Sequence, residues 1–281
     1  MEIKRLIEDT LNIKINTIEP IHGGMMNKAF LINNEYIFYI PVDASNKLVN
    51  RQLENKVSNI FYNLGLASKI IYFDTNTGIK SKKFIHGTSL NHLNFFDIKE
   101  VAILFQSLHN SNLKCGVYYA PFEKLESFYN ECHALNIKLS ETFEDLYLLI
   151  KEKKSFLEDS ERVLCHNDAQ KSNIILGKDN SMYFIDFEFA MDNDPIYDYA
   201  AFGNDNVEDG FELLKESFKP CSITLQKRYY LWRIFISLQW HLVALIKNQN
   251  NEGLKLNINF LEVANHFINN ALYAYNKYII L

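Results

Sequence analysis

Three side chains able to bind metal or move a proton follow one another closely in the stretch 162–198. Asp168 and Asn173 lie five residues apart in a polar loop, and Asp186 comes at the end of the apolar run YFID. A packed core has no use for two carboxylates and an amide at these positions. A polar loop between core strands would explain one of the three residues, but not the whole set in this order.

Such a set suits phosphoryl transfer. The transferred group already carries negative charge, so the protein must orient a hydroxyl and hold the metal ions that neutralise further charge. Asp168 would accept or orient the acceptor hydroxyl. Asn173 and Asp186 would hold Mg²⁺ through hard oxygen ligands.

Short predicted strands position these residues. The sequence indicates a strand at Val163–Cys165, then the loop His166–Asn173, then two apolar strands joined by the turn GKDN. Asp194-Pro195 fits the start of a helix that runs through Asp198.

The same stretch resembles a known family. The segment HNDAQKSN, from His166 to Asn173, looks like the H-x-D-x-x-x-x-N catalytic loop of kinase-like phosphotransferases. The segment IDFEFAMDNDPIYDYA is similar to the metal-binding stretch of choline and ethanolamine kinases, and within that family the bacterial LicA type is the most similar. The resemblance implies an ATP- and Mg²⁺-dependent kinase for a small amino-alcohol, with choline expected first and ethanolamine second. It also implies that Asp198 braces the catalytic loop, as the equivalent aspartate does in related kinases.

The resemblance also extends to the N-terminal part of the chain. Gly23, Gly24, Asn27 and Lys28 match the G-G-x-x-N-K loop that covers the nucleotide in choline kinases. A glycine pair lets backbone N–H groups approach a phosphate, although a plain hairpin turn would explain two glycines equally well.

One position departs from the family pattern. The second strand of the following hairpin usually carries an Arg or Lys that contacts the nucleotide phosphates, and Tyr39 stands there instead. A phenol brings no positive charge. Lys28 is the nearest substitute, or a solvated surface residue. Glu54 matches the helix glutamate that normally pairs with the missing cation, so it would bond to Tyr39, pair elsewhere or lie exposed.

Acidic and aromatic residues suit a cationic acceptor. Glu188 and Asp194 would direct negative charge toward the acceptor side. Quaternary ammonium groups are held by aromatic faces, and the resemblance matches Trp240 to the first Trp of the W-x-x-W pair of choline kinases. Val243 replaces the second Trp, and Phe189 stands where a Tyr is common, so the predicted aromatic cage is partial.

The composition is typical of a globular protein. Hydrophobic residues make up 48% of the 281 residues, and the net charge of −5 argues against nucleic acid as the main partner. The four cysteines are scattered without a C-x-x-C pair, which indicates reduced thiols in a cytoplasmic protein. Polar residues interrupt the most apolar segment, 229–247, so a buried helix is expected there rather than a membrane span.

We therefore predict an α+β, two-lobed, protein-kinase-like fold. A small mixed lobe with an antiparallel sheet, residues 1–87, would bind the nucleotide. A larger, mainly helical lobe, residues 88–281, would carry catalysis and acceptor binding. Two other functions stay open: an aminoglycoside or other small-molecule phosphotransferase of the same fold, and a nucleotide-binding regulatory module without turnover, which Tyr39 would favour.

Overall fold

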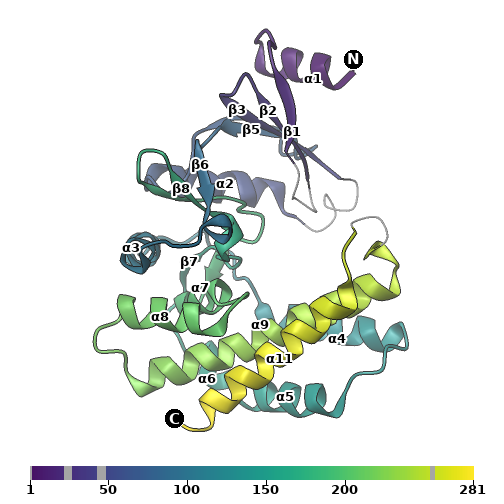
Figure 1. Cartoon of the computed structure of the whole chain (residues 1–281), viewed down its shortest axis with the longest axis vertical. Helices are drawn as coiled ribbons and strands as arrows, with labels where there is room; N and C mark the ends of the chain where they lie inside the picture. Colours follow the sequence, from purple (N-terminus) through teal and green to yellow (C-terminus); the bar gives the residue numbers. More distant parts are fainter. Residues whose placement is uncertain (1, 22–26, 43–48, 254–256) are drawn as a thin grey trace. The chain divides into compact units, whose positions relative to one another are not determined.

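A computed structural model of the chain describes residues 2–21, 27–42, 49–253 and 257–281 (Figure 1). The chain forms two compact units. The first unit consists of Met1–Phe96 and Lys171–Ala190, and the second consists of Asp97–Gln170 and Met191–Leu281. The predicted division into a nucleotide-binding lobe, residues 1–87, and a catalytic lobe, residues 88–281, refers to function and stays a prediction.

The first unit is built on an antiparallel sheet of five strands in the order β1-β2-β3-β5-β4. The β2–β3 hairpin turns at Asn33 and Asn34, whose φ angles of 52° and 53° are better tolerated by asparagine than by most residues. The predicted hairpin is confirmed. The strands are β1 (Ile18–Ile21), β2 (Asn27–Ile32), β3 (Tyr36–Pro41), β4 (Ile70–Phe73) and β5 (Lys80–Lys83).

Helices α1 (Glu2–Leu11) and α2 (Arg51–Asn63) belong to the first unit. Ile7 of α1 packs with Ile32 and Phe38 of the sheet in one apolar cluster. Helix α2 begins at Asn50, whose side chain accepts a hydrogen bond from the Leu53 N–H. Its buried face combines apolar residues with Ser58 and with two charged residues, Arg51 and Glu54, whose partners are described with the site below.

A smaller sheet completes the first unit. Strands β6 (Gly87–Ser89), β8 (Ile174–Gly177) and β9 (Met182–Phe184) pair antiparallel in the order β6-β8-β9. Phe61 of α2 packs against Phe184 and Phe187, with ring centroids 5.8 and 4.5 Å apart. Burying aromatic rings of this size stabilises the unit by roughly 1.5–3 kcal/mol each, and it fixes the segment after β9 on α2.

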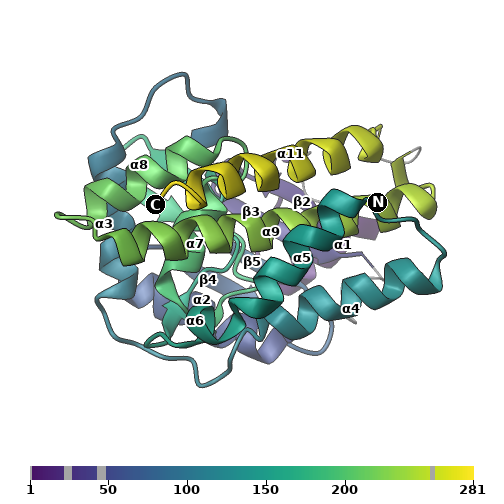
Figure 2. The same cartoon turned by 90° about the horizontal axis from the view of Figure 1, so that it is seen from below.

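The second unit is mainly helical, with α9 at its centre. In Figures 1 and 2, α11 runs alongside α9, and residues of α9 are buried on every side of the helix. The helices are α3 (Ile98–His109), α4 (Pro121–Ala134), α5 (Glu141–Glu152), α6 (Lys154–Glu158), α7 (Pro195–Phe202), α8 (Val207–Ser217), α9 (Ile223–Gln249) and α11 (Phe260–Tyr278).

A two-stranded ribbon in the second unit holds the start of the catalytic loop. Strand β7 (Val163–Cys165) pairs antiparallel with β10 (Met191–Asn193), so that Cys165 lies opposite Met191. The sequence predicted β7 and the β8–β9 hairpin, but β6, β10 and α8 were not anticipated.

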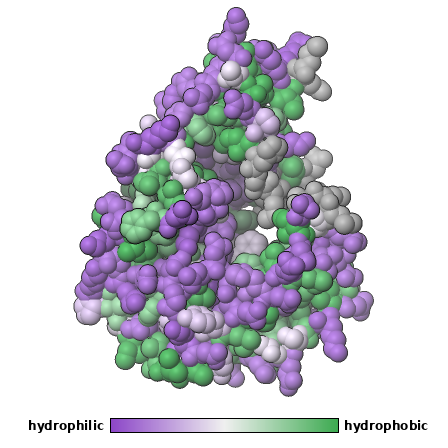
Figure 3. Space-filling view, viewed as in Figure 1, coloured by the Kyte–Doolittle hydropathy of each residue, from purple (hydrophilic) through white to green (hydrophobic). Residues whose placement is uncertain are grey.

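The fold class predicted from the sequence is confirmed, including the buried helix at 229–247. In the described part of the chain, we find no helix with both the length and the apolar character needed to cross a membrane. On the face that Figure 3 presents, hydrophilic residues are widespread, with smaller hydrophobic groups between them.

Candidate active site

Four buried charged side chains meet in the first unit, and we call them the ionic cluster: Arg51, Glu54, Lys80 and Glu188. Lys80 Nζ forms an ion pair with Glu54 and lies 3.6 Å from Glu188 Oε1. Arg51 Nη1 lies 2.8 Å from Glu54 Oε2 and 3.2 Å from Glu188 Oε1. None is more than 5% exposed. Two cations alternate with two carboxylates, so each buried charge is compensated inside the protein.

The register of the sheet explains why Lys80 reaches Glu54. Tyr39 of β3 lies directly opposite Lys80 of β5, and the Lys80 ammonium is 5.3 Å from the centroid of the Tyr39 ring. The cation that pairs with Glu54 therefore comes from the neighbouring strand. Of the possibilities left open for Glu54, pairing elsewhere is the one observed. Lys28 lies exposed on β2, without an ion pair among the described residues.

The charges of the cluster govern one another's ionisation. Burial opposes the ionised form of Glu54, but the Lys80 ammonium and the Arg51 contact outweigh it, so the pKa of Glu54 is lowered. Burial raises the pKa of Glu188, and the nearby negative charge of Asp186 raises it further. Burial also raises the pKa of Tyr39, which therefore stays a neutral phenol near neutral pH.

Asp186 and Asn173, the two predicted metal ligands, belong to the same unit and are linked through the backbone. The Ile185 N–H donates to the Asn173 carbonyl oxygen at 2.9 Å. Asp186 has a φ of 64°, a left-handed conformation that is uncommon outside glycine and that concentrates at functional sites. The chain therefore leaves the extended conformation of β9 at Asp186, the residue that carries the predicted metal-binding carboxylate.

The chemistry of these two residues fits a magnesium ion. Part of the Asp186 side chain is open to solvent, yet protein atoms crowd its carboxylate, and this desolvation raises its pKa while Lys80 opposes the rise. No described residue forms a hydrogen bond or ion pair with that carboxylate. A hard divalent cation would supply the missing partner and favour the ionised form.

The loop that carries Asp168 is braced in the second unit by Asp198, as predicted. Asp198 Oδ2 accepts a hydrogen bond from the His166 N–H at 2.9 Å, and Oδ1 accepts one from the Asn167 N–H at 2.7 Å. His109 Nε2 also lies 2.9 Å from Oδ2. Asp198 is fully buried, so both of its oxygens are used to hold this loop.

Asn167 turns the chain just before Asp168. Its φ is 62°, its Oδ1 accepts a hydrogen bond from Asn193 Nδ2 at 2.7 Å, and its Nδ2 donates to the Met191 carbonyl oxygen at 3.1 Å. These bonds join the loop to β10. The backbone next to Asp168 is therefore fixed by side chains from the other strand of the ribbon.

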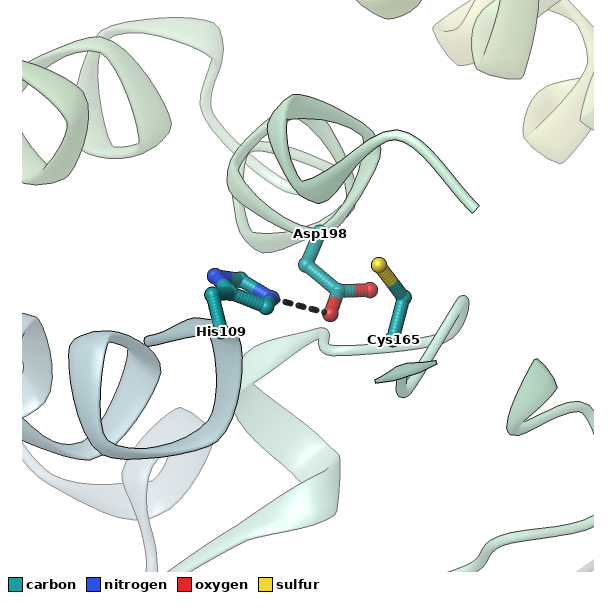
Figure 4. Close-up of side chains that lie close together, drawn as sticks. All are labelled: His109, Cys165 and Asp198. Carbon is teal, nitrogen blue, oxygen red and sulfur yellow. Dashed lines mark hydrogen bonds and ion pairs between the residues drawn. The ribbon is translucent and has the colours of Figure 1, made fainter. Parts of the chain in front are cut away.

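His109, Cys165 and Asp198 lie close together, with their candidate ligand atoms within 4.8 Å of one another (Figure 4). Two of the three hydrogen bonds to Asp198 come from backbone N–H groups of the catalytic loop. Burial raises the pKa of the Cys165 thiol well above its usual value, which keeps it protonated. We therefore interpret the group as a brace and not as a metal centre.

Two tyrosines that the sequence did not single out lie within electrostatic reach of Asp168. Burial raises the pKa of Tyr119 to about 12, hydrogen bonds with Tyr197 and Gln239 oppose the rise, and the charge of Asp168 adds to it. The Tyr119 and Tyr197 rings are 5.5 Å apart in an edge-to-face arrangement. No spacing in the sequence indicates that Tyr119, Tyr197 and Gln239 lie together, because Tyr119 comes from a loop, Tyr197 from α7 and Gln239 from α9.

The residues expected on the acceptor side have different surroundings. Glu188 is a member of the ionic cluster. Asp194 is buried at the start of α7, where Oδ1 accepts from the Ile196 N–H, and Oδ2 accepts from Arg228 Nη1 at 2.9 Å and Trp232 Nε1 at 2.7 Å. These bonds occupy both oxygens of Asp194.

Trp240 of α9 is half-buried and stacks on Phe267 of α11, with ring centroids 6.2 Å apart. Phe189 is half-buried in the first unit.

Of the residues predicted to cover the nucleotide, Gly23 and Gly24 lie outside the described residues. Asn27 is described, and its Nδ2 donates to Glu188 Oε1 at 2.7 Å.

Comparison with known proteins agrees with this geometry. The family model for choline/ethanolamine kinase matches residues 18–211. Protein LicA of Haemophilus influenzae is 23% identical over 254 residues, which cover 82% of this chain and 74% of that protein.

Solved structures establish the fold. A choline/ethanolamine kinase family protein from Mesorhizobium loti superposes with a TM-score of 0.82 at 17% identity, covering 100% of this chain and 98% of that one. Choline kinase LicA from Streptococcus pneumoniae gives a TM-score of 0.74 at 21% identity over 100% of both chains, and a similar LicA structure is a complex with AMP. The chain therefore belongs to the choline/ethanolamine kinase family and is a kinase-like phosphotransferase that acts on an alcohol group.

Proposed function

We propose that the chain transfers the γ-phosphoryl group of ATP to the hydroxyl of choline, with ethanolamine as the next candidate, in a Mg²⁺-dependent reaction. One observation carries the proposal. The Asp168 loop, in a chain of this family, has its backbone held by both oxygens of a fully buried carboxylate, Asp198. Such bracing is what a residue needs when it must meet a reacting hydroxyl in a fixed orientation.

Each proposed role follows from the chemistry of the side chain. Asp168 accepts or orients the proton of the acceptor hydroxyl, which then attacks the γ-phosphorus in line with the leaving oxygen. Asn173 and Asp186 hold Mg²⁺. When bound, the ion neutralises charge that builds on the phosphoryl oxygens.

The nucleotide is proposed to bind the first unit. Gly23, Gly24, Asn27 and Lys28 are proposed to cover its phosphates, and the AMP complex of a similar LicA structure supports a nucleotide of this kind. The pairing of Glu54 with Lys80 supports the same reading, because a helix glutamate that fixes a cation is a regular part of kinase catalysis.

The acceptor is proposed to contact aromatic residues, with Trp240 and Phe189 as candidates. A quaternary ammonium gains roughly 0.5–2 kcal/mol from each aromatic face it touches. We leave Asp194 out of the acceptor site, because Arg228 and Trp232 already take one of its oxygens. Glu188 already pairs with Arg51 and Lys80, so its negative charge is shared with the ionic cluster.

The direct test is ADP release from Mg²⁺-ATP, with choline, ethanolamine or kanamycin as the acceptor and with no acceptor. We expect choline to stimulate release most strongly. Asp168→Asn should lower kcat by about 10²–10⁴-fold with unchanged thermal stability, while Asp145→Asn on an exposed face of α5 should be neutral. Normal turnover by Asp168→Asn would overturn the proposal.

The same assay tests the two alternative functions. Stimulation of ADP release by kanamycin alone would favour an aminoglycoside phosphotransferase. Nucleotide binding without acceptor-stimulated ADP release would favour a regulatory module. The observation that motivated the second rival was Tyr39, and the ion pair of Glu54 with Lys80 weighs against it.

A further inference from the structure

Strand β5 carries a second buried lysine that forms no ion pair with the ionic cluster. Lys82 is 7% exposed and lies two residues beyond Lys80, directly opposite Ile37 of β3. Because side chains alternate along a strand, Lys80 and Lys82 point to the same face of the sheet, and Lys83 points to the other. Two neighbouring ammonium groups therefore occupy one side of β5.

The two lysines differ in their partners. Lys80 has carboxylate partners in Glu54 and Glu188. Lys82 has no hydrogen bond or ion pair among the residues that the structure describes, and its nearest ring is that of Phe187, whose centroid is 4.5 Å from Nζ. A cation–π contact compensates part of the charge but offers no oxygen acceptor to the three N–H donors of an ammonium.

Burial without acceptors has a measurable consequence for Lys82. Desolvation and the neighbouring charge of Lys80 lower the pKa of Lys82 to about 8, against the opposing pull of the carboxylates around them. Among the described residues, Lys82 is thus a largely buried ammonium without a hydrogen-bond acceptor from the protein, and a ligand oxygen would supply one.

Lys82 also lines a hollow of the first unit. Apolar side chains of β3, of β8 and of the segment after β5 form much of its wall, together with Tyr39, Phe187 and the carboxylate-bearing Asp186. Lys82 and the proposed metal ligand Asp186 thus line the same hollow. Apolar side chains beside a cation are chemically suited to part of a nucleotide, which combines an apolar ring with oxygen acceptors.

We propose that Lys82 donates a hydrogen bond to an acceptor oxygen of the bound nucleotide, so that β5 replaces β3 as the strand that contacts this ligand through a cation. In this arrangement, Glu54 and Glu188 fix Lys80, and Lys82 remains available to the ligand. The proposal rests on the proposed function to the extent that it requires a nucleotide to bind. The acceptor oxygen has two possible sources: a phosphate group, or a ring carbonyl such as that of guanine.

The test compares the whole protein with Lys82→Met and Lys83→Met. Lys83 also lines the hollow, so the matched control is a third variant, Lys178→Met, whose lysine is exposed in the β8–β9 turn of the same unit and does not line the hollow. Binding of ADP, GDP, AMP and adenosine is measured by calorimetry in Mg²⁺ buffer, and the thermal midpoint of each free protein is recorded. Lys82→Met should weaken nucleotide binding about tenfold or more, as expected for a lost charge-assisted hydrogen bond.

The same variant should leave the free protein as stable as before or more stable, because methionine fills the space without a buried charge. Opposite signs for stability and binding would separate a ligand-contacting role from a structural one. A loss for ADP but not for adenosine identifies a phosphate oxygen, and a larger loss for GDP than for ADP identifies a ring carbonyl.

Two results would overturn the role of Lys82: nucleotide affinities equal to those of the unsubstituted protein, or a lower thermal midpoint with no specific loss of binding. If the unsubstituted protein binds none of the four compounds, the proposed function fails together with this inference. Asp168→Asn separates failure of the Lys82 role from failure of the proposed function, because it tests turnover without altering the hollow. If Asp168→Asn loses turnover while Lys82→Met binds nucleotides normally, only the role of Lys82 is wrong.

Discussion

The ionic cluster of the first unit and the Asp198 brace of the second both bury carboxylates, but they satisfy them in different ways. Asp198 takes hydrogen bonds from the backbone N–H groups of His166 and Asn167 and from the His109 ring. In the cluster, Glu54 and Glu188 pair with the long side chains of Arg51 and Lys80. One carboxylate fixes backbone, whereas the others fix cations.

The difference shows what each arrangement can do. Backbone donors cannot move without moving the loop, so Asp198 gives the Asp168 loop a single geometry. Side-chain cations leave donors that a ligand can share, and the neighbouring Lys82 has all of its donors without an acceptor in the described structure. The brace is suited to positioning, and the region around the cluster is suited to binding an anion.

The largest effect is expected from Asp198→Ala. It removes the acceptor of three buried donors at once, and two of them are backbone N–H groups that no compensating substitution can remove. We expect the free energy of unfolding to fall by about 3–5 kcal/mol, measured by urea denaturation. Asp145→Ala, on an exposed face, is the control and should change it by less than about 0.5 kcal/mol. A loss below about 1 kcal/mol would show that Asp198 is not the brace.

A smaller loss of unfolding free energy is expected from a substitution in the ionic cluster, and a second substitution should restore most of it. Glu54→Leu leaves Arg51 and Lys80 with Glu188 alone, and should cost about 3 kcal/mol of unfolding free energy. Adding Lys80→Met restores equal numbers of positive and negative charges, so the double variant should regain most of that loss. A double-mutant cycle in urea measures the coupling. If the two losses simply add, Glu54 and Lys80 do not act as a pair.

The sequence predicted the parts of the molecule that depend on local pattern. The β2–β3 hairpin, the helix that starts at Asp194 and the Asp168 loop follow from turn residues, caps and motif spacing. The brace by Asp198 was also predicted, because the resemblance supplied it. Strand β10 was missed, since its three residues have no periodicity of their own and form a strand only by pairing with β7.

The sequence could not predict which cation meets Glu54. Lys80 is 41 residues from Tyr39 along the chain, and only the pairing of β3 with β5 brings them opposite each other. The run KSKK at 80–83 reads as a surface strand, yet Lys80 and Lys82 are buried. The nearby carboxylates, which come from distant segments, make that burial of Lys80 tolerable. Tyr119 and Gln239 were missed for the same reason.

The most direct test of a nucleotide contact through β5 is kcat/KM for ATP in the choline-stimulated reaction, measured for Lys82→Met and Tyr39→Phe. We expect Lys82→Met, with its fold retained, to lose about tenfold or more in kcat/KM for ATP, because Lys82 is the β5 cation proposed to contact the nucleotide. Tyr39→Phe should stay within about threefold of the unsubstituted protein, since its phenol has no charge to lose. Near-normal kcat/KM in Lys82→Met, or a large loss in Tyr39→Phe, would contradict a nucleotide contact through β5 and return that contact to β3.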